Sequence, residues 1–192
     1  MEYNGLLRAS NIKFFVQQLL LEIEGDSSTR EGLKETPDRV ARAYKEWFAG
    51  YSVDIPGLFK IFQEDGEDQI VVLRNIEFSS FCEHHLAPFT GFASIAYLPD
   101  QKVIGASKIG RLVQAYAQRL QIQERMGRQI ADDIMTYLEP KGVVVILKAT
   151  HTCIKCRGLK SQNSEMVTSI VRGAFRTNST SRAEALTLIG NI

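Results

Sequence analysis

The segment Phe81-Cys82-Glu83-His84-His85-Leu86-Ala87-Pro88-Phe89 places a thiol, a carboxylate and two imidazoles at four consecutive positions. A second segment, His151-Thr152-Cys153-Ile154-Lys155-Cys156-Arg157, holds the third histidine and the other two cysteines. All three histidines and all three cysteines of the 192-residue chain therefore fall in two short segments. Because thiolates and imidazoles are preferred ligands of zinc, this segregation predicts one metal site assembled from both segments.

The spacing within these segments indicates which side chains would hold the ion. Cys82 and His85 lie three residues apart, a workable chelating pair within one turn, and Cys153 follows 68 residues later as a third ligand. A catalytic zinc site keeps one of its four positions for water, whereas a structural site fills all four with protein ligands. This set therefore predicts a catalytic ion that acidifies its bound water. His84 and His151 remain as neighbours able to move protons.

The C-x-x-C spacing of Cys153 and Cys156 leaves two alternatives open. Cys156 could complete a structural site with four protein ligands, or it could form a redox pair with Cys153. If the preceding strand continues through these residues, side-chain alternation places His151 and Cys153 on one side and Cys156 on the other, which disfavours both alternatives. A third alternative is that the clustered side chains are ordinary core residues.

The composition is that of a globular protein with one domain, or one domain with an appendage. Hydrophobic residues make up 44% of the chain and charged residues 23%, and the formal net charge is +1. This balance gives no reason to expect a nucleic-acid or membrane partner. An odd number of cysteines fits a reducing compartment better than a disulfide framework. The first residues lack the basic and apolar regions of a signal peptide, so we expect a cytoplasmic protein.

Apolar periodicity predicts two helices in the N-terminal part of the chain. The first spans residues 10–24 with Ser10 as a plausible N-cap, and the second begins at Thr36-Pro37, where the threonine can cap and the proline is tolerated. Gly50 is a natural stop for the second helix. Residues 52–68, with a proline, two glycines and several acids, are expected to form a loop. We therefore predict an N-terminal helical region, residues 1–68, that serves core packing and subunit contact.

From residue 69 onward the pattern changes to strands and a helical pair, and we assign residues 69–192 to one catalytic domain. Hairpin strands on either side of two helices predict an α+β fold with an antiparallel sheet. The expected elements, in order, are strands at 70–73 and 91–98, a helix with an apolar face from Ile109 to Leu120, a helix at Gln123–Leu138, strands at 142–147 and 165–175, and a short helix near 181–189.

Two of these helices carry candidate binding groups near their beginnings. Ser107 is placed to cap its helix, and Lys108 and Arg111 lie within the same turn, a combination that suits an anion such as a phosphate. The plainer alternative is a solvated helix face with an ordinary cap. Glu124 lies in the first turn of the following helix, where a carboxylate also interacts favourably with the helix dipole.

Five segments of the chain together resemble the GTP cyclohydrolase I family, and the similarity runs from about residue 30 to Ile189. The segments are Arg30-Glu31-Gly32-Leu33 with Thr36-Pro37-Asp38-Arg39-Val40, Cys82-Glu83-His84-His85, Val103-Ile104-Gly105-Ala106-Ser107-Lys108-Ile109-Gly110-Arg111, Gln121-Ile122-Gln123-Glu124-Arg125, and His151-Thr152-Cys153 with Arg157-Gly158.

The resemblance implies a tunnelling fold. In that fold a four-stranded antiparallel sheet has two helices between its second and third strands, and the sheets of neighbouring subunits join into a barrel. Enzymes of the family are typically homodecamers with active sites between subunits. They hydrolyse GTP at C8 of the purine, release formate and form 7,8-dihydroneopterin triphosphate, a precursor of tetrahydrofolate and tetrahydrobiopterin.

The resemblance also implies a role for each matching position, with Zn²⁺ as the cofactor and GTP as the substrate. Three positions match the zinc ligands, and three match catalytic groups at the purine and ribose. The others match groups that recognise guanine or hold the triphosphate. The zinc ligands are Cys82, His85 and Cys153; the catalytic positions are His84, His151 and Ser107; the guanine-binding positions are Glu124 and the adjacent Gln123; and the phosphate-binding cations are Lys108, Arg111 and Arg157.

Two positions depart from the family pattern. Gly127 stands where a threonine is common, and Ala185 stands where a phenylalanine is common. Neither is a catalytic group, so we expect them to affect packing alone. Two other functions remain to be weighed: a non-catalytic zinc or redox module, and a sister enzyme of the same fold that acts on another purine or pterin.

Overall fold

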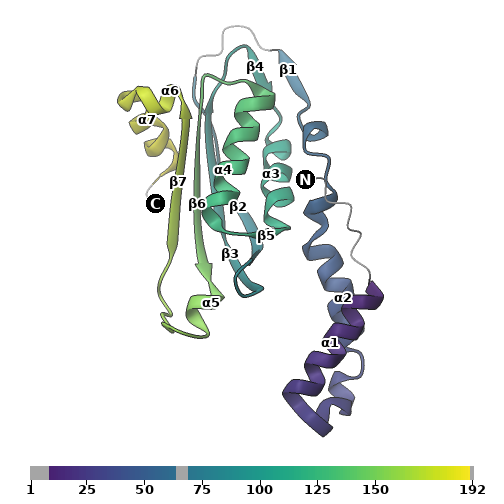
Figure 1. Ribbon diagram of the computed structural model, residues 1–192. Coiled ribbons are helices and arrows are strands. Elements are labelled where there is room, and N and C mark those ends of the chain that lie inside the picture. Colours follow the sequence, from purple (N-terminus) through teal and green to yellow (C-terminus); the bar gives the residue numbers. More distant parts are fainter. Residues whose placement is uncertain (1–8, 64–68, 191–192) are drawn as a thin grey trace.

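The structure, a computed structural model, describes residues 9–63 and 69–190 (Figure 1). Short 3₁₀ turns lie at Gly25–Thr29, Glu31–Leu33, Ala49–Ser52 and Pro56–Leu58, and a π-helical turn lies at Ile134–Leu138. The helices and strands are α1 (Ala9–Glu24), α2 (Thr36–Trp47), β1 (Ile61–Gln63), β2 (Val71–Cys82), β3 (Ala87–Leu98), β4 (Lys102–Ile104), α3 (Ala106–Ala117), β5 (Leu120–Gln121), α4 (Gln123–Asp133), β6 (Gly142–His151), α5 (Thr152–Lys155), β7 (Met166–Gly173), α6 (Ala174–Thr177) and α7 (Ser179–Ile189).

The main sheet has five strands in the order β5-β2-β3-β6-β7. The four long strands pair antiparallel with their neighbours, and α3 and α4 lie in the connection between β3 and β6. The predicted α+β class is therefore confirmed. The sheet is mixed, however, and not wholly antiparallel, because the two residues of β5 pair parallel with the end of β2. Strands β1 and β4 form a separate antiparallel pair.

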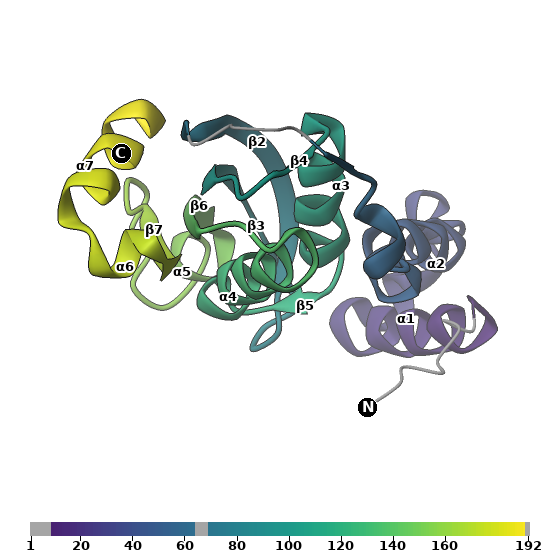
Figure 2. The same ribbon diagram turned by 90° about the horizontal axis from the view of Figure 1, so that it is seen from above.

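Two apolar clusters cover the two faces of the sheet, and β6 contributes to both. Val143, Val145 and Leu147 face the larger cluster, which is covered by α3 and α4, while Val144 and Ile146 face a smaller cluster beneath α7 (Figure 2). Because side chains alternate along a strand, a strand buried on both faces needs a continuous apolar run. The apolar run that predicted a strand at residues 142–147 forms the first part of β6.

The helices α1 and α2 pack against each other and extend beyond the lower end of the sheet in Figure 1. None of the residues of α1 is buried, and Phe15, Leu19 and Ile23 are each more than half exposed. The 3₁₀ turn after α2 joins the pair to the main body. A Cβ atom on Gly50 in this turn would lie 2.2 Å from the main-chain oxygen of Ala115, so only glycine permits this approach to α3.

Several expectations about helix ends were wrong. Ser10 lies inside α1, and Thr36 is the first residue of α2, after Glu35 at the N-cap position, so neither side chain caps a helix. Gly50 does not stop α2, which already ends at Trp47. Ser107 is not a cap either, because Gly105 holds the N-cap position of α3 and provides no side chain.

The extent of the strands also differs from the prediction. Part of the expected loop at 52–68 forms β1, and residues 64–68 lie outside the described residues. Strand β2 continues from the apolar run through a polar stretch to Cys82, with an irregularity at Asn75, where φ is 56°. The prediction followed apolar residues alone, and so it missed the part of the strand where polar side chains alternate with buried ones.

The two departures from the family pattern lie in tightly packed places. A Cβ atom on Gly127 would lie 2.4 Å from Cδ1 of Ile170, so glycine lets α4 lie close to β7. Ala185 is fully buried in the cluster beneath α7, which also contains Phe175. Among the described residues, no helix combines the length and apolar character needed to cross a membrane.

Candidate active site

The turn between β2 and β3 holds the first cluster of candidate ligands. Cys82 is the last residue of β2 and pairs with Ala87, the first residue of β3. The main-chain oxygen of Cys82 accepts a hydrogen bond from the N–H of Leu86 at 2.9 Å, and Leu86 has a left-handed backbone with φ of 51°. This tight turn brings His85 back over Cys82, whose side chain is 6% exposed.

The second cluster reaches the same place because β6 pairs with β3. His151, the last residue of β6, lies opposite Phe89 in the antiparallel register, and the short helix α5 follows at once and carries Cys153. One ligand atom from each of Cys82, His85 and Cys153 can be chosen so that all three lie within 4.8 Å of one another. The predicted convergence of the two segments on one site is therefore present.

The chemistry of this group suits a metal ion. Burial raises the pKa of the Cys153 thiol, and the neighbouring Cys82 raises this pKa further. Two adjacent thiols resist ionisation together unless a cation lies between them, because two thiolates repel each other. A donor set of two sulfurs and one imidazole nitrogen is typical of sites for soft or borderline transition metals. Cys82, His85 and Cys153 thus form a group that could bind such an ion.

Cys156 does not belong to this group. It is exposed, and the metal-binding group found among the described residues contains only the other two cysteines. The argument from strand alternation was wrong, because β6 ends at His151 and Cys153 lies on a helix. Cys156 follows the last residue of α5, and its side chain is exposed to solvent.

The two remaining histidines have contrasting surroundings. His84 is exposed on the turn, and its Nδ1 atom lies 3.6 Å from the sulfur of Cys82. His151 is 9% exposed and stacks on Phe89, with ring centroids 4.4 Å apart and ring planes 6° apart. Burial lowers the pKa of His151, although the nearby Glu124 carboxylate acts in the opposite direction. Burial therefore favours the neutral form of the His151 imidazole.

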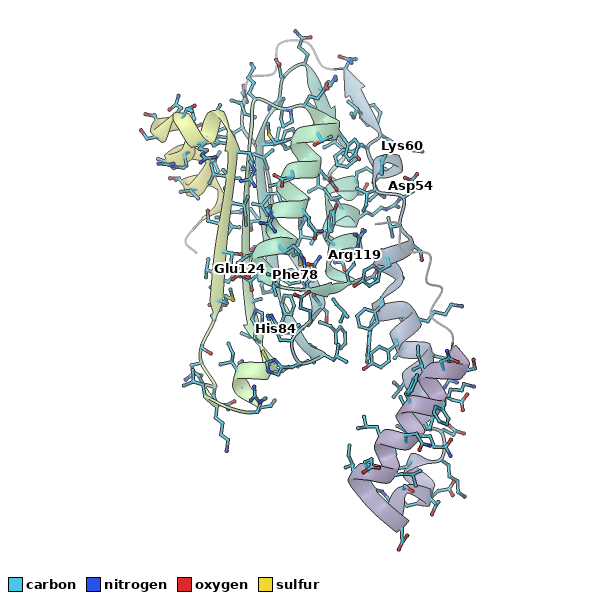
Figure 3. All side chains as sticks on the ribbon, in the orientation of Figure 1. Asp54, Lys60, Phe78, His84, Arg119 and Glu124 are labelled. Atoms are coloured by element: carbon cyan, nitrogen blue, oxygen red, sulfur yellow. The ribbon has the colours of Figure 1, made fainter. Side chains whose placement is uncertain are left out.

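Glu124 and Gln123 begin α4 but point in different directions. Glu124 is exposed, and both Glu124 and His84 lie in the lower half of the part of the molecule formed by the sheet in Figure 3. Gln123 is 1% exposed, and its amide nitrogen donates to the main-chain oxygens of Leu147 and Met166, each at 3.0 Å. The protein interior thus occupies the polar side-chain atoms of Gln123, and a substrate contact by this residue stays a prediction.

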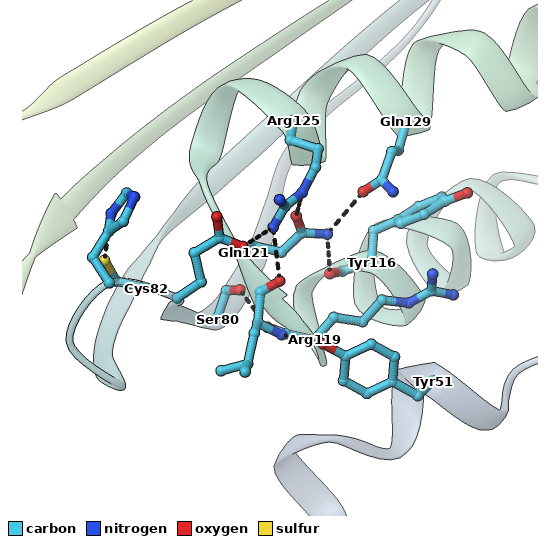
Figure 4. A network of polar contacts seen from close by, with 11 residues as sticks. Tyr51, Ser80, Cys82, Tyr116, Arg119, Gln121, Arg125 and Gln129 are labelled. Atoms are coloured by element: carbon cyan, nitrogen blue, oxygen red, sulfur yellow. Dashed lines mark hydrogen bonds and ion pairs between the residues drawn. The ribbon is translucent and has the colours of Figure 1, made fainter. Parts of the chain in front are cut away.

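A polar network that the sequence analysis missed ties the β2–β3 turn to α4 (Figure 4). Glu83 forms an ion pair with Arg125, and the hydrogen bond from Arg125 is the main cause that lowers the pKa of Glu83. Arg125 also donates to Leu120 and to the side chain of Gln121. The N–H of Glu83 donates to the main-chain oxygen of Gln121 at 3.0 Å. The adjacency of Glu83 to Cys82 was the only available signal for this role.

The predicted phosphate-binding cations divide between the two ends of the molecule. Arg157 lies at the metal-binding end, where its Nη1 atom is 2.9 Å from Nε2 of His85. Ser107, Lys108 and Arg111 lie near the beginning of α3. This helix has 12 residues, so its ends are about 16 Å apart, and its far end leads into β5, which pairs with Cys82. Ser107 and Lys108 thus lie at the end of α3 opposite to the one that leads to the metal-binding group, and Arg111 lies near the middle of the helix.

The fold and the convergent side chains together define an α+β protein with a group of two cysteines and one histidine that could bind a metal ion. The model of the GTP cyclohydrolase I family matches residues 12–190, and the chain belongs to this family. The resemblance seen in the sequence motifs is thereby confirmed.

Curated relatives match over nearly their whole length. GTP cyclohydrolase 1 of Thermoanaerobacter pseudethanolicus is 48% identical, with 90% of this chain and 92% of the relative covered. GTP cyclohydrolase 1 of Caldanaerobacter subterraneus subsp. tengcongensis is 45% identical, with 97% and 99% covered.

Two solved structures are similar over 55% of this chain. The archaeosine synthase QueF-Like in the apo form is 17% identical with a TM-score of 0.46, and 94% of that chain is covered. E. coli dihydroneopterin aldolase in complex with neopterin is 13% identical with a TM-score of 0.44, and 99% of that chain is covered. Likenesses at this level carry no conclusion about this chain.

Proposed function

We propose that this protein is a GTP cyclohydrolase I, which hydrolyses GTP at C8, releases formate and forms 7,8-dihydroneopterin triphosphate as the first step of tetrahydrofolate or tetrahydrobiopterin synthesis. Membership of the family supports the reaction. The observation that carries the proposal is the convergence of Cys82, His85 and Cys153 from two distant segments. Their donor atoms suit Zn²⁺, and three protein ligands leave one position of a tetrahedral ion free.

The residues around this group have the chemistry that the reaction requires. A bound zinc would supply a Lewis acid that lowers the pKa of water. His151 and His84 lie beside the group as proton carriers, and burial favours the neutral form of His151, which can accept a proton. The exposed carboxylate of Glu124 can accept hydrogen bonds from N1–H and the amino group of guanine. Adenine lacks both donors, so this contact would select the base.

The division of the cations supports an active site shared between subunits. Ser107 and Lys108 lie about one α3 length, and Arg111 about half of that length, from the end of α3 that leads to the metal-binding group of the same chain. A triphosphate bound to the metal-binding end of one chain would meet these groups only if another copy supplied them. Exposed apolar side chains on α1 are the kind of surface that subunit contacts bury.

We therefore propose a homo-oligomer, with the decamer implied by the family resemblance, in which sheets of the tunnelling fold join into a barrel. In this proposal residues 1–68 form the N-terminal helical region and residues 69–192 the catalytic domain. Strand β1 crosses that division to pair with β4. A cytoplasmic location, where GTP is available, belongs to the same proposal.

A direct test is to incubate the zinc-loaded protein with GTP, with and without a chelator. Formate and a product that becomes fluorescent after oxidation are expected without chelator, and neither is expected once zinc has been removed. Adding zinc back should restore both. Full zinc occupancy without formate release would refute the proposed activity and favour a non-catalytic metal module. Formate release that is unaffected by complete zinc removal would refute the metal-dependent part alone.

A further inference from the structure

The side chain of Gln123 is held in one orientation by three hydrogen-bond acceptors. Its amide nitrogen donates to the main-chain oxygens of Leu147 on β6 and Met166 at the start of β7, and lies 3.2 Å from the hydroxyl of Thr168. Only the NH₂ end of an amide can donate to two carbonyl oxygens. The assignment of the amide nitrogen and oxygen atoms therefore follows from the contacts, and the oxygen points the other way.

The amide oxygen of Gln123 faces the ring of His151, with Oε1 2.9 Å from Nε2. An amide oxygen accepts hydrogen bonds and cannot donate them, so Nε2 of His151 must carry the proton. Phe89 holds the same ring by parallel stacking and is itself fully buried. The ring is thus fixed in its plane by Phe89 and in its rotation by Gln123.

The other ring nitrogen, Nδ1, is left open. Within residues 9–63 and 69–190, every side-chain nitrogen or oxygen that is shielded from solvent has a hydrogen-bond partner. The described residues provide no hydrogen bond to Nδ1 of His151. Nδ1 therefore reaches solvent, on the side of the ring away from Gln123, and it carries the free lone pair.

We propose that Gln123 is a positioning residue, which anchors the Nε2–H of His151 and presents Nδ1 as the ring atom that meets the substrate. This inference rests on the proposed function. It gives Gln123 a role different from contact with guanine, and it places the recognition of the base on the neighbouring Glu124. One helix start would thus serve two tasks, because Gln123 points inward to the histidine and Glu124 points outward.

The test combines the ring spectrum of His151 with kinetics of Gln123→Met, a variant of similar size without hydrogen-bonding groups. The chain has only three histidines, so nitrogen-15 spectra of the zinc-loaded oligomer labelled in histidine can be assigned with a His151→Asn variant. In the unchanged protein we expect a slowly exchanging proton on Nε2 of His151. In Gln123→Met this signal should be lost, and kcat should fall by about 10- to 100-fold, as for other positioning residues.

Zinc content and the KM for GTP should change by less than about twofold in Gln123→Met, because uniform substrate binding is not removed. Gln114→Met is the matched control, since Gln114 also donates to a main-chain oxygen, that of Glu77, but from α3. It should retain both the His151 signal and kcat.

Three outcomes would overturn the proposal. A ring proton on Nδ1 in the unchanged protein is the first, and it can be observed even if Gln123→Met fails to fold. A persistent, protected Nε2–H in Gln123→Met is the second. A higher KM with unchanged kcat would instead assign Gln123 to substrate contact. If the unchanged protein released no formate from GTP, the proposed function would fail, while the spectrum would still decide whether the Gln123–His151 bond exists.

Discussion

The candidate site residues at the two ends of the helical layer differ in how many bonds they form with other residues of the same chain. At the end near β5, side chains from β2, β6, α4 and α5 converge on the metal-binding group, and hydrogen bonds tie them to one another. At the other end, Ser107, Lys108 and Arg111 stand near the start of α3, and no hydrogen bond or ion pair of their side chains is found among the described residues. The first end is organised by the fold of a single chain.

This difference indicates how the proposed active site is divided. Groups that perform chemistry must be held to within a fraction of an ångström, and the interior of one chain can do that through packing and hydrogen bonds. Cations that hold a flexible triphosphate need less exact support, and long side chains from another copy can reach the same site. We expect the two ends to respond differently to substitution.

The largest effect is expected at the metal-binding end. Cys153→Ala removes one of three ligands, so zinc should be lost and formate release should fall by at least about 10³-fold. Metal analysis of the purified variant and a formate assay measure the two effects. Cys156→Ser is the control on the same short segment and should retain both zinc and activity. Loss of zinc in Cys156→Ser would instead support a structural or redox role for the C-x-x-C pair.

Mixed oligomers test the division between the two ends directly. Cys153→Ala and Lys108→Ala should each have little activity alone, for different reasons. When the two variants are assembled together, sites that combine an intact metal-binding end with an intact α3 start should recover about a quarter of full activity, if two copies contribute to each site. The measurement is formate release per subunit after joint reassembly.

The matched control mixes two variants from the same end, Cys153→Ala and His85→Ala. Because both ligands come from one chain, this mixture should contain no intact metal-binding group and should remain inactive. Recovery in this control, or no recovery when Cys153→Ala is mixed with Lys108→Ala, would contradict the proposed division.

Glu124→Ala should give an intermediate effect that is confined to the base. Zinc should remain bound, because Glu124 is not part of the metal-binding group. The ratio of kcat/KM for GTP to that for ATP should fall by about 10²-fold or more, since the lost carboxylate is the group that distinguishes the two purines. Competition between the two nucleotides measures this ratio. Glu184→Ala on α7 serves as a control for the loss of an exposed carboxylate and should leave the ratio unchanged.

The metal-binding end could be predicted from the sequence because its residue types are rare and clustered. The residue types alone identified Cys82, His85 and Cys153 as candidate ligands. The prediction of a shared site then needed only one further assumption, that the two segments lie next to each other in the fold. The role of Gln123 could not be predicted, because it depends on acceptors from β6 and β7 that lie 24 and 43 residues further along the chain. Glutamine beside a candidate guanine-binding glutamate gives no sign of which way its side chain points.

The sequence could not predict where Ser107, Lys108 and Arg111 lie relative to the metal-binding group, for a different reason. Local signals identified a helix start with suitable cations, but the direction in which α3 crosses the sheet is set by the connection from β3 through β4. The polar part of β2 was missed in a similar way, since its strand character comes from pairing with β3 and not from an apolar run. The predicted α+β class was nevertheless correct, because it depends only on the order of the helices and strands along the chain.

The smallest effect is expected for the ion pair that ties the metal-binding turn to α4. Glu83→Gln keeps the size of the side chain but removes the charge that Arg125 contacts, while the main-chain bond from Glu83 to Gln121 stays in place. Because both side chains are about one-third exposed, the direct contribution of the pair to folding is small, and the melting temperature should fall by only a few degrees, about 1–4 °C. Zinc affinity should fall more clearly, by about 10-fold, since a neighbour of a ligand helps to orient it.

Titration with a competing chelator measures that affinity in the Glu83→Gln variant. Glu77→Gln, an exposed position earlier on β2, is the matched control and should change neither zinc affinity nor melting temperature. Equal zinc affinity in the two variants would mean that the turn between β2 and β3 holds its ligands without help from α4. The pairing of β2 with β3 and the junction between β6 and α5 would then be enough to position the ligands. The polar network around Arg125 would contribute to folding alone.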